Sequence, residues 1–492
     1  MLCTVHYRGT SGMIAGVLRQ KSPKYRSCPT LLLPVLFLAA CAFAIGEDIV
    51  EDPALSAGSF TIRRFDSQAF SEPASVLTSK QRQIFMAGRS VFNRQWAAVT
   101  SLNGDWGLGP TFIADRCSGC HVKSGRGAPP QSGEQLVSTL VRLSIPGTDE
   151  HGGPRPHPSY GDQIQNRSLD GRNVDLASNG TPVPNEADLF LDWEESTVAF
   201  EDGETVTLRK PKLRIENLKF GELDSETMFS LRIASPVVGT GFLEAVPEET
   251  LLAIAQKQRA QNFNGRPNRV WDAANKRMTL GRFGWKANTP NLKQQIAAAA
   301  LGDMGVNSKL YSEQNCPPVQ TICARQLPGN FPEIIDHEID AVELWLQGLA
   351  VPARRDVADS AVRRGALLFA TAQCAVCHVP DMKTGAVANL PQLSGQVFHA
   401  YTDLLLHDMG DELADGRPDF AAGPRDWRTP PLWGLGLSQV VSGSTAMLHD
   451  GRARTVSEAI LWHGGEAQGS RAAFRGMSRE DRDALVKFVE AI

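Results

Sequence analysis

The sequence from Cys117 to Pro130 reads CSGCHVKSGRGAPP, and the sequence from Cys374 to Gly385 reads CAVCHVPDMKTG. Each stretch opens with two cysteines that are separated by two residues and followed directly by a histidine. This is the attachment pattern of c-type haem, in which the thiols form thioethers and the adjoining histidine ligates the iron. The pattern predicts haem at Cys117, Cys120 and His121, and again at Cys374, Cys377 and His378.

One alternative is a single zinc site formed by all four cysteines. Zinc does not require a histidine directly after the second cysteine, and the two pairs lie much further apart in the sequence than the ligand pairs of zinc ribbons. The other alternative is exchange of electrons by free thiols. The repeated histidine favours covalently bound haem over both.

The bulk composition is that of an ordinary globular protein. The chain has 492 residues, of which 42% are hydrophobic and 21% are charged, with a net charge of -4. A chain of this length predicts about two to four domains. The charge favours neither a nucleic acid nor a membrane surface as a partner. The content of glycine (44) and proline (30) indicates long ordered loops.

The N-terminus is typical of an export signal, which we place at residues 1–44. Basic residues precede the apolar stretch LLLPVLFLAA, from Leu31 to Ala40, which is too short for a membrane span of about 20 residues. The phrase LAAC resembles a bacterial lipobox, so we expect a lipoprotein signal of residues 1–40 and a lipid anchor at Cys41. Cleavage after Ala44 is the alternative. The protein is then expected in the periplasm, where the lipid would anchor it to a membrane.

Cys316 and Cys323 form a second kind of cysteine pair, in the phrase NCPPVQTIC. In the oxidising compartment of an exported protein they are expected to form a small structural disulfide. A catalytic dithiol is the alternative, but this spacing lacks the close pair at a helix start that lowers a thiol pKa.

Helical periodicity flanks both haem motifs. Helices are predicted from Ser79 and from Val357, before the two motifs, and from Glu333 and Met477, after them. The phrases GRSVF and GALLF form a weak internal repeat. We therefore expect two haem modules, at residues 79–355 and 356–492, with a boundary in VPARRD.

The first module carries a long insertion, at about residues 130–266. Within it, the alternating phrase from Phe200 contains Asp-Gly and predicts a β-hairpin. The expected fold class is mainly α, with two cytochrome c-like haem domains, the first with a long loop and a β-hairpin insertion.

Four phrases carry a resemblance to a known family: GRFGWKANTPNLKQQ, YTDLLLHDMG, MLHDGRART and ILWHGGEA. The chain resembles the bacterial di-haem cytochrome c peroxidases and their MauG-like relatives, and within them the branch called di-haem oxidoreductase or thiol-oxidoreductase-like. The resemblance covers residues 79–492. It implies two cytochrome c-like helical domains, each with one haem.

The resemblance also implies a distal ligand for the C-terminal haem. In the family this ligand follows an HxG phrase by fourteen residues and is usually Met or Tyr. Here the phrase begins at His449, and the position holds His463, so the second haem is expected to be ligated by His378 and His463. Imidazole in place of a thioether lowers the reduction potential. A helix-end role for His463, with His407 or Met409 as the ligand, is the alternative.

For the N-terminal, peroxidatic haem, the resemblance places Trp285 between the haems, with Gln295 ten residues later. Asp303 stands two residues before the position of the family's catalytic Glu, and Ala299 replaces a Pro. Asp303 is the expected acid/base, with Glu244 as the alternative carboxylate. Ordinary packing for Trp285 and a capping role for Asp303 stay open. Arg282 is expected at a haem propionate or in a surface ion pair.

These assignments predict a periplasmic, peroxidase-like oxidoreductase. Electrons from a small redox protein, a cytochrome c or a cupredoxin, pass through the second haem and Trp285 to reduce peroxide at the first haem. The alternatives are an electron carrier without peroxidase activity and MauG-like oxidation of a protein or organic substrate. Relatives often hold a calcium ion between the haems, which makes calcium a possible further cofactor.

Overall fold

The computed structural model describes residues 52–98, 105–169, 182–325 and 331–492. The predicted export signal and the lipid anchor at Cys41 lie outside these residues. Residues 51–492 form one compact unit, so the division into modules at residues 355 and 356 stays a prediction. In the described part of the chain, helices long and apolar enough for a membrane span are absent.

The prediction of a mainly α fold is wrong, because the structure has 31% helix and 20% strand. The described strands pair into two three-stranded and five two-stranded sheets. The larger sheets lie in the insertion, where partner strands are far apart in the sequence. β4, for example, pairs with β9 through partners such as Thr139 and Ile233. Such pairing leaves a weak local signal, so only the hairpin was predicted from the sequence.

The helices of the described residues are α1 (Ser79–Asn93), α2 (Cys117–Cys120), α3 (Thr240–Glu244), α4 (Glu248–Arg259), α5 (Leu292–Met304), α6 (Asp336–Gly348), α7 (Ser360–Thr371), α8 (Ser438–Ser442), α9 (Val456–Leu461), α10 (Gln468–Arg475) and α11 (Arg479–Ala491).

The strands are β1 (Thr61–Ile62), β2 (Thr111–Phe112), β3 (Glu134–Gln135), β4 (Thr139–Thr148), β5 (Pro154–Arg155), β6 (Arg167–Ser168), β7 (Asp188–Ala199), β8 (Thr205–Glu216), β9 (Met228–Ile233), β10 (Arg269–Asp272), β11 (Arg277–Leu280), β12 (Val351–Pro352), β13 (Met382–Lys383), β14 (Val397–Phe398), β15 (Leu406–Asp408) and β16 (Asp426–Arg428).

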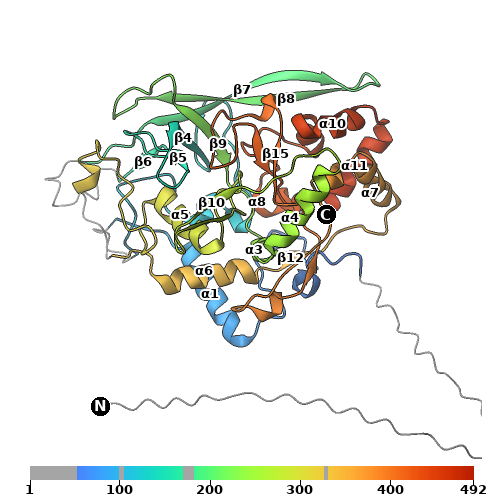
Figure 1. Cartoon of the computed structure of the whole chain (residues 1–492), viewed down its shortest axis with the longest axis horizontal. Coiled ribbons are helices and arrows are strands. Elements are labelled where there is room, and N and C mark those ends of the chain that lie inside the picture. The colour runs from blue at the N-terminus through green and yellow to red at the C-terminus, as the bar shows by residue number, and fades with distance from the viewer. Residues whose placement is uncertain (1–51, 99–104, 170–181, 326–330) are drawn as a thin grey trace, which may run out of the picture. The chain divides into compact units, whose positions relative to one another are not determined.

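Two helix pairs flank the haem motifs, as the periodicity predicts. α1 packs against α6, and α7 packs against α11 (Figure 1). Local side chains set the helix starts: Asp359 accepts hydrogen bonds from the first turn of α7, and Ser478 accepts one from the backbone N–H of Asp481 in α11. These caps satisfy N–H groups that have no partner within the helix.

A glycine permits the close approach of the helices in each pair. A Cβ on Gly88 of α1 would overlap the backbone carbonyl of Ala341 in α6, and a Cβ on Gly365 of α7 would overlap that of Ala484 in α11. Gly88 and Gly365 are the first residues of the phrases GRSVF and GALLF. The internal repeat is therefore also a repeat of helix packing.

The β-hairpin is present, but it begins earlier than predicted. β7 precedes Phe200 and pairs with β8 along twelve residues of each strand, and the turn lies between Ala199 and Thr205 (Figure 1). The phrase from Phe200 is therefore the turn and the second strand. The first strand was missed because its polar stretch DWEEST masks the alternation.

The insertion has a small hydrophobic core of its own, in which Leu136, Val141, Leu143, Tyr160 and Leu191 are buried. Beside it, Cys316 and Cys323 form the predicted disulfide, with their Cα atoms 5.7 Å apart. The larger core is continuous and contains both helix pairs.

Candidate functional site

The three predicted iron ligands share one hydrogen-bonding arrangement. The Nδ1 atoms of His121, His378 and His463 lie 2.7, 2.9 and 2.7 Å from backbone carbonyl oxygens of Ser235, Tyr401 and Ala459. A carbonyl oxygen only accepts, so each Nδ1 carries the proton and donates. The lone pair of each ring is then on Nε2, in the orientation that suits a metal ligand.

The two motif histidines also have matching neighbours. The ring of Phe92 lies 6.1 Å from that of His121, and the ring of Phe369 lies 6.2 Å from that of His378. Each phenylalanine is one helical turn after the glycine of its helix pair. The helix packing therefore places each motif histidine in the same way.

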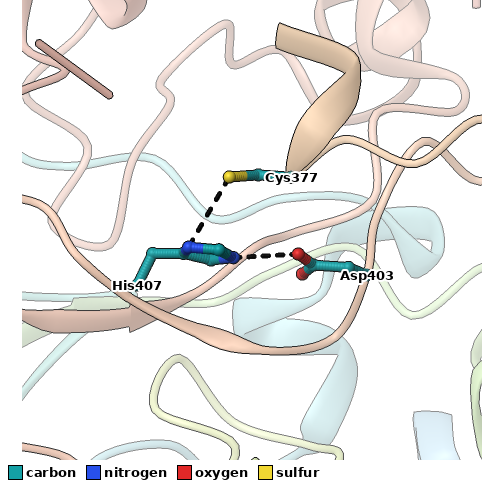
Figure 2. Close-up of side chains that lie close together, drawn as sticks. All are labelled: Cys377, Asp403 and His407. Atoms are coloured by element: carbon teal, nitrogen blue, oxygen red, sulfur yellow. Dashed lines mark hydrogen bonds and ion pairs between the residues drawn. The ribbon is translucent and has the colours of Figure 1, made fainter. Parts of the chain in front are cut away.

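The four motif cysteines do not gather into a zinc site. Within the described ranges, the only group of three or more His, Cys, Asp or Glu side chains with ligand atoms within 4.8 Å of one another is Cys377, Asp403 and His407 (Figure 2). Burial raises the pKa of Cys117, Cys120 and Cys374 to about 12, so these thiols are poor thiolates near neutral pH. The first finding disfavours zinc binding, and the second disfavours dithiol chemistry.

The carboxylates around His407 favour its imidazolium form, which disfavours His407 as a competing iron ligand. Its Nε2 lies 2.8 Å from Asp403, and its Nδ1 lies 3.0 Å from Glu466 and 3.6 Å from the sulfur of Cys377. Burial alone would lower its pKa, but the charge and hydrogen bond of Asp403 raise the pKa to about 12. A doubly protonated ring has no lone pair for a metal, so the group in Figure 2 is an ion-pair cluster.

A large cavity lies beside the second motif, and we name it the second cavity after that motif. Its volume is about 1320 Å³, counted out to its open mouth, and its walls are mostly apolar. Cys374, Cys377, His378 and His463 all line it, and so does Met409. Burial lowers the pKa of His378 to about 4, and a positive charge on His463 would lower it further. Burial also lowers the pKa of His463. Both rings are therefore neutral near pH 7, as iron ligation requires.

The residues of this cavity fit a haem with two axial histidines. The two thiols are free, the two imidazoles present Nε2, and the walls supply apolar contacts. His449 and Trp427 also line the cavity and stack on each other, with ring centroids 3.7 Å apart. Burial lowers the pKa of His449 to about 4, so that ring is neutral as well.

The first motif lies near a buried carboxylate. Asp303, at the C-terminal end of α5, is close enough to Cys117 and Cys120 that its charge adds to the effect of burial on both thiol pKa values. Gln163 donates a hydrogen bond of 2.8 Å to the Asp303 carboxylate. Burial raises the pKa of Asp303, although the bond from Gln163 opposes the shift. A carboxyl group with a raised pKa suits proton transfer.

Glu244, the last residue of α3, lies against the N-terminal end of α5. Its carboxylate accepts hydrogen bonds from the backbone N–H of Leu292 at 2.8 Å and from the side chain of Gln347 at 2.9 Å. At a helical rise of about 1.5 Å per residue, Leu292 and Asp303 are about 17 Å apart along α5. The structure thus does not bring the two candidate carboxylates together.

Gln295 and Arg282 are also away from the cavity. Gln295 is half-buried on α5. Arg282 is half-buried, and desolvation lowers the pKa of its guanidinium, which donates to the carbonyl of Leu243 at 3.4 Å. The described lining of the second cavity includes neither residue. Their predicted roles stay predictions.

Trp285 lines the second cavity and connects it to the first motif. Its Nε1 donates a hydrogen bond of 2.8 Å to the carbonyl of Ile233. Two residues later, the carbonyl of Ser235 accepts the hydrogen bond from His121. A short peptide segment, residues 233–235, therefore joins Trp285 to the first motif histidine.

The carbonyl acceptors of the three histidines were not predicted from the sequence, because every residue type has a backbone carbonyl. Gln163, which is distant in sequence from Asp303, was not predicted either, and neither were two arginines of the second cavity, Arg126 and Arg428. Arg126 lies in the phrase CSGCHVKSGRGAPP, where its position between two glycines was the available signal.

A comparison with protein families gives one match. The family model described as "Di-haem oxidoreductase, putative peroxidase" matches residues 54–492. No curated protein and no solved structure matches the chain significantly. The match covers both motifs and both helix pairs, and a di-haem family implies haem cofactors. The chain belongs to the di-haem oxidoreductase family.

Proposed function

We propose that this protein is a periplasmic, c-type di-haem peroxidase in which electrons pass from the second haem to the first. The observation that carries the proposal is the connection from Trp285, on the wall of the second cavity, through residues 233–235 to His121. When bound, haem supplies electron storage at both sites and oxygen–oxygen bond cleavage at the first. The net reaction is hydrogen peroxide plus two electrons and two protons to two waters.

The residues of the two sites have different roles in this proposal. His378 and His463 would both ligate the iron of the second haem, which would leave that site to electron transfer. His121 would ligate the iron of the first haem. Asp303, whose pKa is raised by burial, would move protons between the peroxide oxygens.

The electron donor in this proposal is a small redox protein, a cytochrome c or a cupredoxin. Its place is the periplasm, and the disulfide between Cys316 and Cys323 supports an oxidising compartment. Attachment to the membrane through a lipid on Cys41 is part of the same proposal. The predicted lipobox supports it.

Spectra of the holoprotein before and after addition of one electron test the function. We expect a low-spin second haem in both states, and a first haem whose high-spin form reacts with peroxide after the electron is added. Two low-spin haems that are indifferent to peroxide would instead indicate an electron carrier.

Variants of tryptophan test the path. Trp285→Phe should slow electron transfer from the second haem to the first, measured after rapid one-electron reduction. Trp193→Phe, on the hairpin strand β7, is the matched control and should transfer electrons at the wild-type rate. Equal rates in all three proteins would remove Trp285 from the path.

A further inference from the structure

Two buried guanidinium groups in the second cavity have no carboxylate partner. The described lining includes three arginines, Arg126, Arg428 and Arg471, and no Asp or Glu. Arg471 already pairs with Glu412, at 2.8 Å. Arg126 and Arg428 are 6% and 7% exposed, and neither forms an ion pair with a described residue. A buried charge without a counter-charge is costly, so the pair calls for an anion.

Of the two arginines, Arg126 more clearly lacks hydrogen-bond partners. Its Nε and Nη1 atoms are buried and have no hydrogen-bond partner. Burial lowers the pKa of its guanidinium to about 10, which leaves the group charged near neutral pH. Its backbone is fixed on both sides. Gly127 donates to the carbonyl of Ala234 at 3.0 Å, and a Cβ on Gly125 would lie 3.0 Å from the side chain of Val441 in α8.

Arg428 reaches the same cavity from β16. Its Nε donates to the carbonyl of Gly284 at 2.9 Å, and its Nη1 donates to the carbonyl of Thr429 at 3.2 Å. Its backbone N–H donates to the carbonyl of Trp285 at 2.9 Å. Carbonyl dipoles orient this guanidinium, and the charge of Asp403 acts on it against the effect of burial, but no described carboxylate forms an ion pair with it. Arg428 is therefore held in place with its charge still available to an anion.

We propose that Arg126 and Arg428 form a dicarboxylate-binding pair that holds the two propionate groups of the haem in the second cavity. The fork of a guanidinium matches a carboxylate in shape and charge, and two such groups match the two acidic substituents of one haem. This inference rests on the proposed function only in that the cavity holds haem. It does not require peroxide to be the substrate.

The pair joins two distant parts of the chain. Arg126 follows the first motif histidine, His121, by five residues, whereas Arg428 belongs to the C-terminal part of the chain. The second haem would thus be anchored partly by the attachment segment of the first. The positive charges also disfavour ferric haem, so they raise the reduction potential of the second haem and partly offset the effect of its two histidines.

Redox titration of each haem tests the pair, with Arg126→Gln, Arg428→Gln and the conservative Arg126→Lys. Arg364→Gln is the matched control, because Arg364 is half-exposed and pairs with Asp481 on the surface. In each glutamine variant the equilibrium constant for reducing the second haem should fall about tenfold or more, which is 59 mV for one electron. The first haem and the control should stay at wild-type values.

A second readout is the propionate bending mode in the resonance Raman spectrum, which responds to hydrogen bonds on the propionates. It should shift in Arg126→Gln and in Arg126→Lys, since lysine keeps the charge but loses the fork. If Arg126→Gln does not fold or does not attach haem, the propionate mode of Arg126→Lys tests the inference in its place. An unchanged mode there would overturn the inference.

The outcomes separate the two proposals. A potential that shifts at the first haem instead of the second would assign Arg126 to the first site and overturn the pair. Wild-type potentials in both glutamine variants would do the same. Shifted potentials in a protein that ignores peroxide would support the pair and reject the peroxidase. A negative pyridine haemochrome assay of the wild-type protein would reject both.

Discussion

His121 and His378 have nearly the same surroundings on one side and very different ones on the other. Each follows a pair of free thiols, donates from Nδ1 to a backbone carbonyl and lies near a phenylalanine of a glycine-crossed helix pair. Near the second pair of thiols lies a cavity that His463 also lines. Near the first pair lies the buried carboxylate of Asp303. The repeated packing places the motif histidine in the same way at both sites, and the two sites differ in the residues that the rest of the chain adds.

Asp303→Asn gives the sharpest test of this difference. Removal of the acid/base should slow peroxide reduction by about 10²–10⁴-fold, because no other carboxylate takes over the proton transfer. Steady-state peroxide consumption with a reduced donor measures the effect. Glu244→Gln is the control at the other end of α5, and its rate should stay near the wild-type value. The opposite pattern would make Glu244 the catalytic carboxylate.

His463→Ala should change the second site alone. Loss of one axial imidazole should convert the second haem from low-spin to high-spin, as read by electron paramagnetic resonance. His407→Ala is the control. It should lower stability but keep the low-spin signal, because the His407 imidazolium is held by Asp403 and Glu466. A low-spin signal in His463→Ala would return the ligand role to Met409 or His407.

Gly88→Ala and Gly365→Ala test what the two sites share. Each added methyl would overlap a backbone carbonyl across its helix pair, so the helices must separate. We expect each substitution to lower the free energy of unfolding by about 3 kcal/mol, at the upper end of overpacking effects. Chemical denaturation measures it. Gly469→Ala, on exposed α10 with no atom within 4 Å of its Cβ, should be neutral or stabilising.

The insertion in the first part of the chain contains Glu186, and this residue should make the stability of the protein depend on pH. The residue is 1% exposed, and burial raises its pKa to about 8, against hydrogen bonds from the backbone of Gln165 and the side chain of Gln320. Between about pH 5 and pH 8 the unfolded chain ionises at this residue and the native protein does not. Stability should therefore fall as pH rises, by at most about 1.4 kcal/mol per pH unit.

Glu186→Gln should flatten that fall, measured by denaturation at a series of pH values. Glu150→Gln, in the same insertion and largely exposed, should keep the wild-type slope. If the slope of Glu186→Gln equals that of the wild type, Glu186 is not the group that titrates.

Local patterns made part of the molecule predictable. The Cys-x-x-Cys-His motifs, the helix caps at Asp359 and Ser478, and the disulfide depend on residues within a few positions of each other. The sheets of the insertion were not predictable, since β4 and β9 meet across about ninety residues. The placement of Arg126 was not predictable either, because only tertiary packing carries its side chain to the cavity beside the other motif.

The carbonyl acceptors of His121, His378 and His463 have a consequence for mutagenesis and for evolution. Main-chain oxygens are present whatever residue occupies positions 235, 401 and 459. A substitution at one of these positions leaves the accepting oxygen in place, so it tests the side chain and not the hydrogen bond to the imidazole. The three imidazoles keep the same tautomer as long as the chain path is preserved.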